Sequence, residues 1–136
     1  MASSGYYTTG NSNWRFKYTV DVGSPSGQTY PFTYKFYLYR PNSSSYYWGA
    51  KWIFSGKVNG TSWSYNFHEP NKINVPAKTD VLVKTYTVNV NISNYSVSAR
   101  SITVSAGFSD NGSGVSPYSS NGGSITVSIP ANASGV

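Results

Sequence analysis

The chain of 136 residues contains no cysteine, so disulfides, thiolate metal sites and cysteine nucleophiles are excluded. Leucine is nearly absent and strong helix formers are scarce, so significant helix is not expected. No apolar run approaches the ~18 residues of a membrane-spanning helix, and no membrane association is expected. Residues 1–7 show no basic segment followed by an apolar one, so no secretory signal is expected there.

Aromatic residues and strand formers dominate the composition. Aromatics make up 17% of the chain and include 13 tyrosines, while valine, isoleucine, threonine and serine are plentiful. These residue types fit a pleated, half-buried surface, which favours β-structure. The length is that of one domain, and a domain of this size buries roughly two-thirds of its unfolded surface without needing cross-links.

Apolar and polar residues alternate along most of the chain, as is typical of half-buried antiparallel strands. Asn59-Gly60 is a strong hairpin signal, because both central residues of a type I′ turn need positive φ. We therefore expect an all-β, antiparallel two-sheet β-sandwich, Ig-like or jelly-roll-like, over residues 13–130, with a flexible N-terminal segment at 1–12 and a flexible tail at 131–136. The pattern predicts about seven strands, near residues 14–22, 32–39, 46–58, 61–68, 80–92, 97–108 and 124–129.

Several segments are similar to a known family. The stretch FSGKVNGTSWSYNF at 54–67 has the form strand, Asn-Gly hairpin, return strand, and RSITVSAGF at 100–108 precedes a Gly/Ser loop and GSITVSIPANAS at 123–134. The opening MASSG, followed by WRF at 14–16, is also similar. The chain resembles minor structural, tail-associated proteins of siphophages that infect Gram-positive bacteria.

The resemblance implies a function without catalysis. Such a protein is a structural component of the phage virion, at or near the host-facing end of the tail or tail fibre, and is assembled in the host cytoplasm. Its implied partners are other virion proteins and further copies of itself, with host-surface contact through a bacterial wall polysaccharide as a further role.

The net charge of +6 comes from ten basic and four acidic residues. A basic excess favours an anionic partner, but the basic residues are scattered singly and form no stripe. Nucleic acid is therefore not expected as a partner, because neutralising its backbone needs clustered cations.

Residues able to carry catalysis are few. Glu69 and Asp80 flank one loop, and His68 is the single histidine, but no nucleophile elbow accompanies it. The loop at 110–114 superficially resembles a calcium loop yet lacks the further ligands and terminal glutamate. We expect solvated turn and strand-end residues at these positions, and hence no enzyme, no cofactor and no metal site.

Aromatic residues crowd positions 37–52 on both parities of the predicted strands, more than one core face needs. Exposed aromatic platforms stack on sugar rings or pack against another chain. Either a subunit interface or a carbohydrate-binding module or lectin would use such a surface. The candidate interaction surface comprises six aromatic residues bordered by three basic ones: Tyr37, Tyr39, Tyr46, Tyr47, Trp48, Trp52, Lys35, Arg40 and Lys51.

Overall fold

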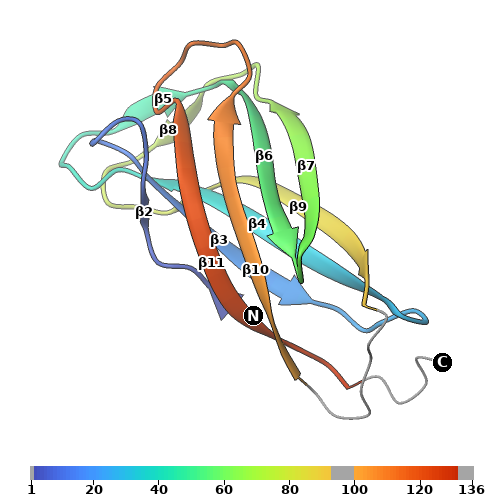
Figure 1. Cartoon of the computed structure of the whole chain (residues 1–136). Helices are drawn as coiled ribbons and strands as arrows, with labels where there is room; N and C mark the ends of the chain where they lie inside the picture. Colours follow the sequence, from blue (N-terminus) through green and yellow to red (C-terminus); the bar gives the residue numbers. More distant parts are fainter. Residues whose placement is uncertain (1, 93–99, 132–136) are drawn as a thin grey trace.

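The computed structural model describes residues 2–92 and 100–131, and in these ranges the chain is all-β and contains no helix (Figure 1). The prediction of an all-β chain is confirmed. No described segment forms a helix of the length and hydropathy that crossing a membrane requires. The strands are β1 (Ala2–Ser3), β2 (Tyr7–Thr8), β3 (Arg15–Val22), β4 (Thr29–Tyr39), β5 (Tyr46–Trp48), β6 (Lys51–Val58), β7 (Thr61–His68), β8 (Ile73–Val75), β9 (Val81–Asn91), β10 (Arg100–Asp110) and β11 (Ser119–Ile129).

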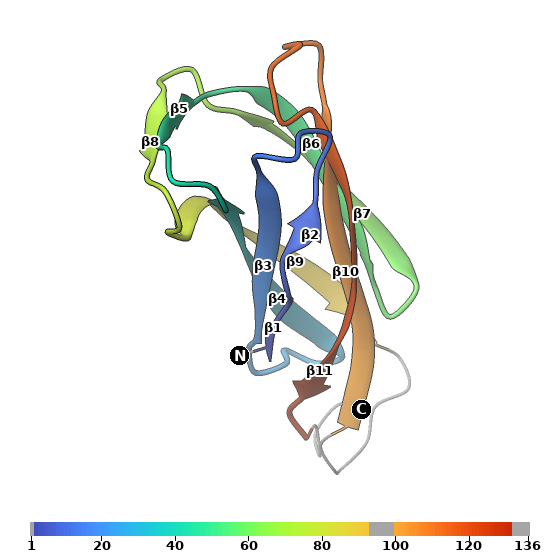
Figure 2. The ribbon, with the colours of Figure 1, turned by 90° about the vertical axis from the view of Figure 1, so that its left-hand side faces the viewer.

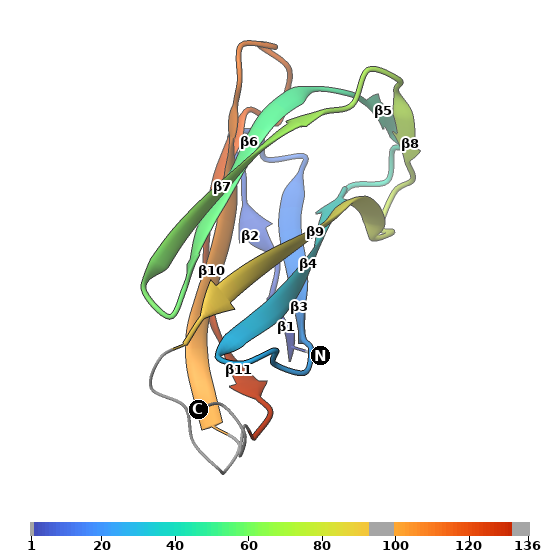
Figure 3. The ribbon, with the colours of Figure 1, turned by 90° about the vertical axis from the view of Figure 1, so that its right-hand side faces the viewer.

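Two antiparallel sheets form most of the structure. The first has the order β1-β3-β4-β9, with β2 also paired to β3, and the second has the order β11-β10-β6-β7. A small sheet of β5 and β8 lies at one end, visible at the upper right of Figure 3. The two larger sheets share one aromatic core, in which Phe36 of β4 stacks on Phe54 of β6 with ring centroids 4.1 Å apart.

The alternation seen in the sequence sets the two faces of the first sheet. On β4 every even-numbered residue from Tyr30 to Leu38 is buried, and the odd-numbered residues are half-buried on the outer face. On β3 the pattern is the same for Phe16, Tyr18 and Val20. The predicted strands at 14–22 and 32–39 therefore agree with the structure.

Core tyrosines also connect the two sheets through hydrogen bonds. The Tyr18 hydroxyl donates to the Gly123 carbonyl at 2.6 Å, and the Tyr34 hydroxyl donates to the Ser105 carbonyl at 3.2 Å. The acceptors lie beside a register shift between β10 and β11, where Gly122 has φ +58 and any Cβ would collide with the Ala106 carbonyl oxygen. The glycine permits the bulge, and the tyrosines satisfy carbonyls at or near it that are turned toward the core.

The third predicted strand, at 46–58, is two strands. β5 pairs with β8, whereas β6 pairs with β7 and β10, and the chain changes sheets at Gly49 and Ala50. The burial pattern gives no sign of this change, because Trp48, Ala50 and Trp52 are all buried. Together with the short strands β1, β2 and β8, this gives eleven strands among the described residues, against about seven predicted for the chain.

The first residues, predicted to be a flexible segment, pair with β3 instead. Ala2 lies opposite Val20, and Tyr7 lies opposite Phe16. Figure 2 shows these strands on the flank between β3 and β11. Residues 93–99 and 132–136 lie outside the described residues, so the start of the sixth predicted strand and the flexible tail stay predictions.

Candidate functional site

The structure divides the nine residues predicted as one interaction surface among several places. Tyr37, Tyr39 and Lys35 lie half-buried on the outer face of β4. Tyr46 and Tyr47 of β5 are the most exposed large aromatic residues among the described ones, and Lys51 of β6 is also exposed.

Trp48 and Trp52 do not belong to any surface. Their exposed fractions are 1% and 0%, and the Trp52 ring stacks on Phe108 with centroids 3.7 Å apart. The physical reason is their parity, since both share the inward parity of Phe54. The prediction that Trp48 and Trp52 belong to the interaction surface is therefore wrong, and both side chains are part of the core.

Arg40 is also removed from the exposed set, because its exposed fraction is only 5%. Its guanidinium lies 4.7 Å from the Trp14 ring centroid and 5.3 Å from that of Tyr46. Its Nε donates to the Ser44 carbonyl at 3.0 Å. Such cation–π contacts fix the Tyr46 ring at the end of the first sheet.

The outer face of the first sheet carries three of the predicted residues, Lys35, Tyr37 and Tyr39, together with aromatic, apolar and charged residues from other segments. The cross-strand register places Lys17 opposite Tyr37 and Tyr37 opposite Leu82, so one row crosses β3, β4 and β9. Tyr6 and Leu82 are 49% and 45% exposed, which makes this row an open, partly apolar surface. We call the cluster of Tyr6, Lys17, Tyr37, Tyr39, Asp80 and Leu82 the tyrosine face.

Polar contacts hold the rings of the tyrosine face in place. The Tyr6 ring lies 4.5 Å from the Tyr39 ring, and its hydroxyl donates to Oδ1 of Asp80 at 2.6 Å. Nζ of Lys17 donates to Oδ2 of the same carboxylate at 2.8 Å and lies 5.4 Å and 5.8 Å from the Tyr6 and Tyr37 ring centroids. The hydrogen bond to Asp80, more than burial, raises the pKa of Tyr6 to about 12.

Sequence reasoning missed two exposed members of this face. Tyr6 lies in the segment that was predicted to be flexible. Leu82 lies in the strand predicted near 80–92, where plain alternation would place it on the same side as Tyr86 and Val88. The register of β4 and β9 instead shifts between Phe36 and Tyr37 and turns Leu82 outward. No sequence signal marks this bulge. The Tyr6-Tyr7 pair next to a predicted strand, in contrast, is a signal that the N-terminal segment could pack against the sheet.

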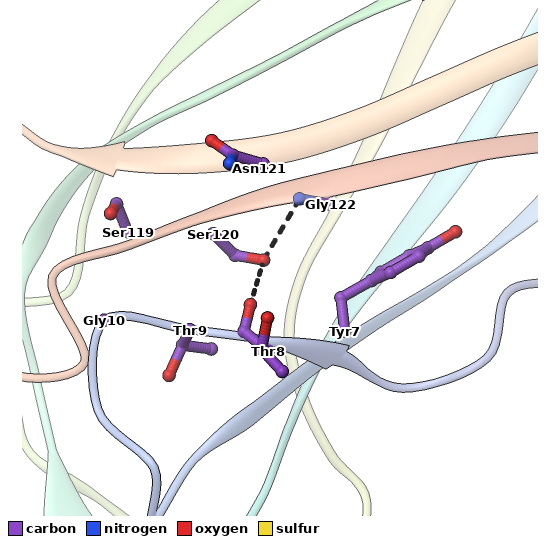
Figure 4. A pocket seen from close by; sticks show the side chains of 8 residues that line it. All are labelled: Tyr7, Thr8, Thr9, Gly10, Ser119, Ser120, Asn121 and Gly122. Atoms are coloured by element: carbon purple, nitrogen blue, oxygen red, sulfur yellow. Dashed lines mark hydrogen bonds between the residues drawn. The ribbon is translucent and has the colours of Figure 1, made fainter.

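A small depression lies where the N-terminal segment meets β11 (Figure 4). Its volume is about 260 Å³, and uncharged residues line it. The Ser120 hydroxyl donates to the Thr8 carbonyl at 2.8 Å and accepts from the Gly122 amide at 3.1 Å. These bonds join the two segments, and the lining contains no carboxylate, histidine, lysine or arginine.

The groups considered for catalysis are separated or already engaged. His68, Glu69, Lys51 and Lys72 line a shallow depression of about 240 Å³, whereas Asp80 is held by Tyr6 and Lys17. Among residues 2–92 and 100–131, no three His, Cys, Asp or Glu side chains are grouped to hold a metal ion.

The loop at 110–114 forms a capped turn. The Asp110 carboxylate accepts hydrogen bonds from the Ser113 hydroxyl and, at 2.8 Å, from the Gly114 amide. These bonds hold the pKa of Asp110 below its usual value. A carboxylate that caps its own turn is the arrangement expected of an Asx-type loop.

Comparison with known proteins gives no relative: no family model matches the chain, and no match is found among the curated proteins or the solved structures.

Proposed function

We propose that this chain is a non-enzymatic structural component of a phage virion, associated with the tail or tail fibre and folded as an Ig-like or jelly-roll-like β-sandwich. It makes contact with other virion proteins, and with the host surface, through the tyrosine face. The sequence resemblance to siphophage tail proteins supports the setting, and the geometry of the tyrosine face supports the mode of action.

The observation that carries the proposal is a half-exposed group of rings whose conformations are fixed before any partner arrives. Tyrosine and arginine are enriched at protein interfaces, where a flat apolar ring with a polar tip suits a partly wet contact. Because Asp80 and Lys17 already hold the Tyr6 ring, binding at this face loses little conformational entropy. Contact through a rigid surface is what an assembly component requires.

The direct test is to look for the chain in particles. Mass spectrometry of phage particles purified from the source of the sequence is expected to detect it, and an antibody against it is expected to label the tail in electron micrographs. Particles that are infectious but contain none of the chain would refute the virion role.

A carbohydrate-binding module or lectin is the second candidate, and the lysines of the same face favour it. Lys17 and Lys35 lie beside the rings, and the net charge is +6, which suits an anionic wall polysaccharide. Tyr39→Ala is expected to weaken binding of purified Gram-positive wall polysaccharide at least about tenfold in calorimetry, since one stacking ring is lost.

The matched control is Tyr47→Ala, which removes an exposed ring of the same kind outside the tyrosine face. It is expected to bind the polysaccharide as the unchanged chain does. No measurable heat with the unchanged chain, or equal weakening by the two variants, would remove the carbohydrate role of this face.

A further inference from the structure

The first sheet ends in a long strand with one unpaired side. β9 has eleven residues and, within the described part of the chain, pairs only with β4. No described strand pairs with the backbone amides and carbonyls on its other side, so this edge can take another strand. Such an edge is a template for pairing with an extended segment of a second chain.

On the opposite flank, the start of the edge strand β11 is covered. There the N-terminal segment runs against β11, with the Gly10 amide donating to the Ser119 carbonyl at 2.8 Å and Ser120 bonded to Thr8. On the β9 flank, β7 and β9 are the edge strands of the two larger sheets and do not pair with each other. Rings bridge them, because Tyr65 stacks on Tyr86 with centroids 4.4 Å apart.

The two ends of β9 differ in how well they can accept a strand. At its start, the register shift opposite Phe36 and Tyr37 bends the strand, and Lys84 places its charge over the Tyr65 ring. Bulges and charges of this kind protect edges. Residues 85–91 pair with β4 in unbroken register, from Lys35↔Thr85 to Thr29↔Asn91, and contain neither charge nor proline.

We propose that residues 85–91 of β9 pair antiparallel with the same residues of a second copy of this chain, centred on Val88, so that two first sheets join into one. The pairing names a second copy of the chain as one partner within the proposed virion role. The pairing depends on that role only because the role leads us to expect self-association. A two-fold axis then relates the two copies, as in most homodimers.

Side-chain chemistry favours a second copy as the occupant. In the centred register Val88 faces its own counterpart, Tyr86 faces the partner's Val90, and Thr87 faces the partner's Asn89. Apolar residues meet apolar ones on one face and polar residues meet polar ones on the other, as cross-strand pairing favours. The segment contains no charge, so the two edges meet without direct repulsion although each chain carries +6.

The experiment introduces charges on either side of the two-fold axis and measures the mass of the full chain in solution by light scattering. Thr87→Glu with Asn89→Glu places like charges opposite one another and is expected to weaken the dimer about a hundredfold. Thr87→Glu with Asn89→Lys places opposite charges face to face and is expected to restore it. Denaturation midpoints of both variants show whether the monomer still folds.

The matched control is Ser64→Glu with Asn66→Glu on β7, the other unpaired edge of the same flank, where both residues are exposed. This variant is expected to remain a dimer. A monomeric unchanged chain, a dimer that survives the β9 glutamates, failure of the lysine to restore pairing, or dissociation by the β7 glutamates would each overturn the proposal. Detection of the chain in particles is a separate measurement, so failure of β9 pairing is distinguishable from failure of the virion role.

Discussion

Trp52→Ala is expected to destabilise the fold by about 3–5 kcal/mol. The side chain is 0% exposed, stacks on Phe108, and lies 4.6 Å from the Trp48 ring. Its removal takes a large apolar area out of the core and leaves a cavity that the surrounding rings cannot fill without moving. Since small domains have only about 5–15 kcal/mol of stability in total, much of the native margin would be lost.

Urea denaturation followed by circular dichroism measures this loss. Tyr47→Ala is the comparison, because a side chain that is 62% exposed makes few contacts and its removal is expected to change stability by about 0.5 kcal/mol or less. A Trp52→Ala protein as stable as the unchanged chain would contradict the buried placement and return Trp52 to the candidate ligand-contacting residues.

The sequence predicts which side chains of a strand share a face. It does not predict, for every strand, which of the two faces is buried in the core. Tyr37 and Tyr39 alternate in the sequence with Phe36 and Leu38, and the structure places the two pairs on opposite faces of β4. In the region of Trp48 and Trp52, however, aromatic residues occupy both parities, and period-two alternation alone does not say which set meets the other sheet. The tryptophans were therefore included in a surface from which they are absent.

Contacts between distant segments were beyond sequence reasoning for a different reason. Tyr6 and Asp80 are 74 residues apart, and their hydrogen bond depends on β2 joining β3 and on where β9 begins. A repeating pattern fixes which residues share a face but not which strand is the neighbour. The tyrosine face is thus a product of strand order, and only part of it was visible as Tyr37 and Tyr39.

Alkaline pH is expected to unfold the protein steeply, starting near pH 10. Burial raises the pKa of Tyr34 to about 12, and burial also raises the pKa of Tyr18 far above its usual value. In the unfolded chain both tyrosines ionise near pH 10, so the unfolded state releases protons that the folded state retains. Because the folded pKa is raised, this stabilisation is complete below pH 10 and is lost as the pH rises toward the folded values.

The expected slope follows from the number of protons involved. Each tyrosine that ionises only in the unfolded chain lowers the free energy of unfolding by about 1.4 kcal/mol per pH unit. Tyr18 and Tyr34 together contribute a loss of about 2.7 kcal/mol per unit between pH 10 and the pKa of about 12 for Tyr34, and the surface hydroxyl of Tyr6, held by Asp80, adds to it. Urea midpoints collected at intervals through this range measure the slope directly.

Tyr34→Phe separates the two contributions. The variant loses the hydrogen bonds that Tyr34 makes with Ser105 and Trp63, so it is less stable at neutral pH, but its slope above pH 10 is expected to be smaller by about 1.4 kcal/mol per pH unit. Tyr47→Phe, at an exposed position, is expected to leave the slope unchanged. An unaltered slope in the Tyr34→Phe variant would mean that this hydroxyl has the same pKa in the folded and the unfolded chain. That result would contradict the burial of the Tyr34 hydroxyl between the two sheets.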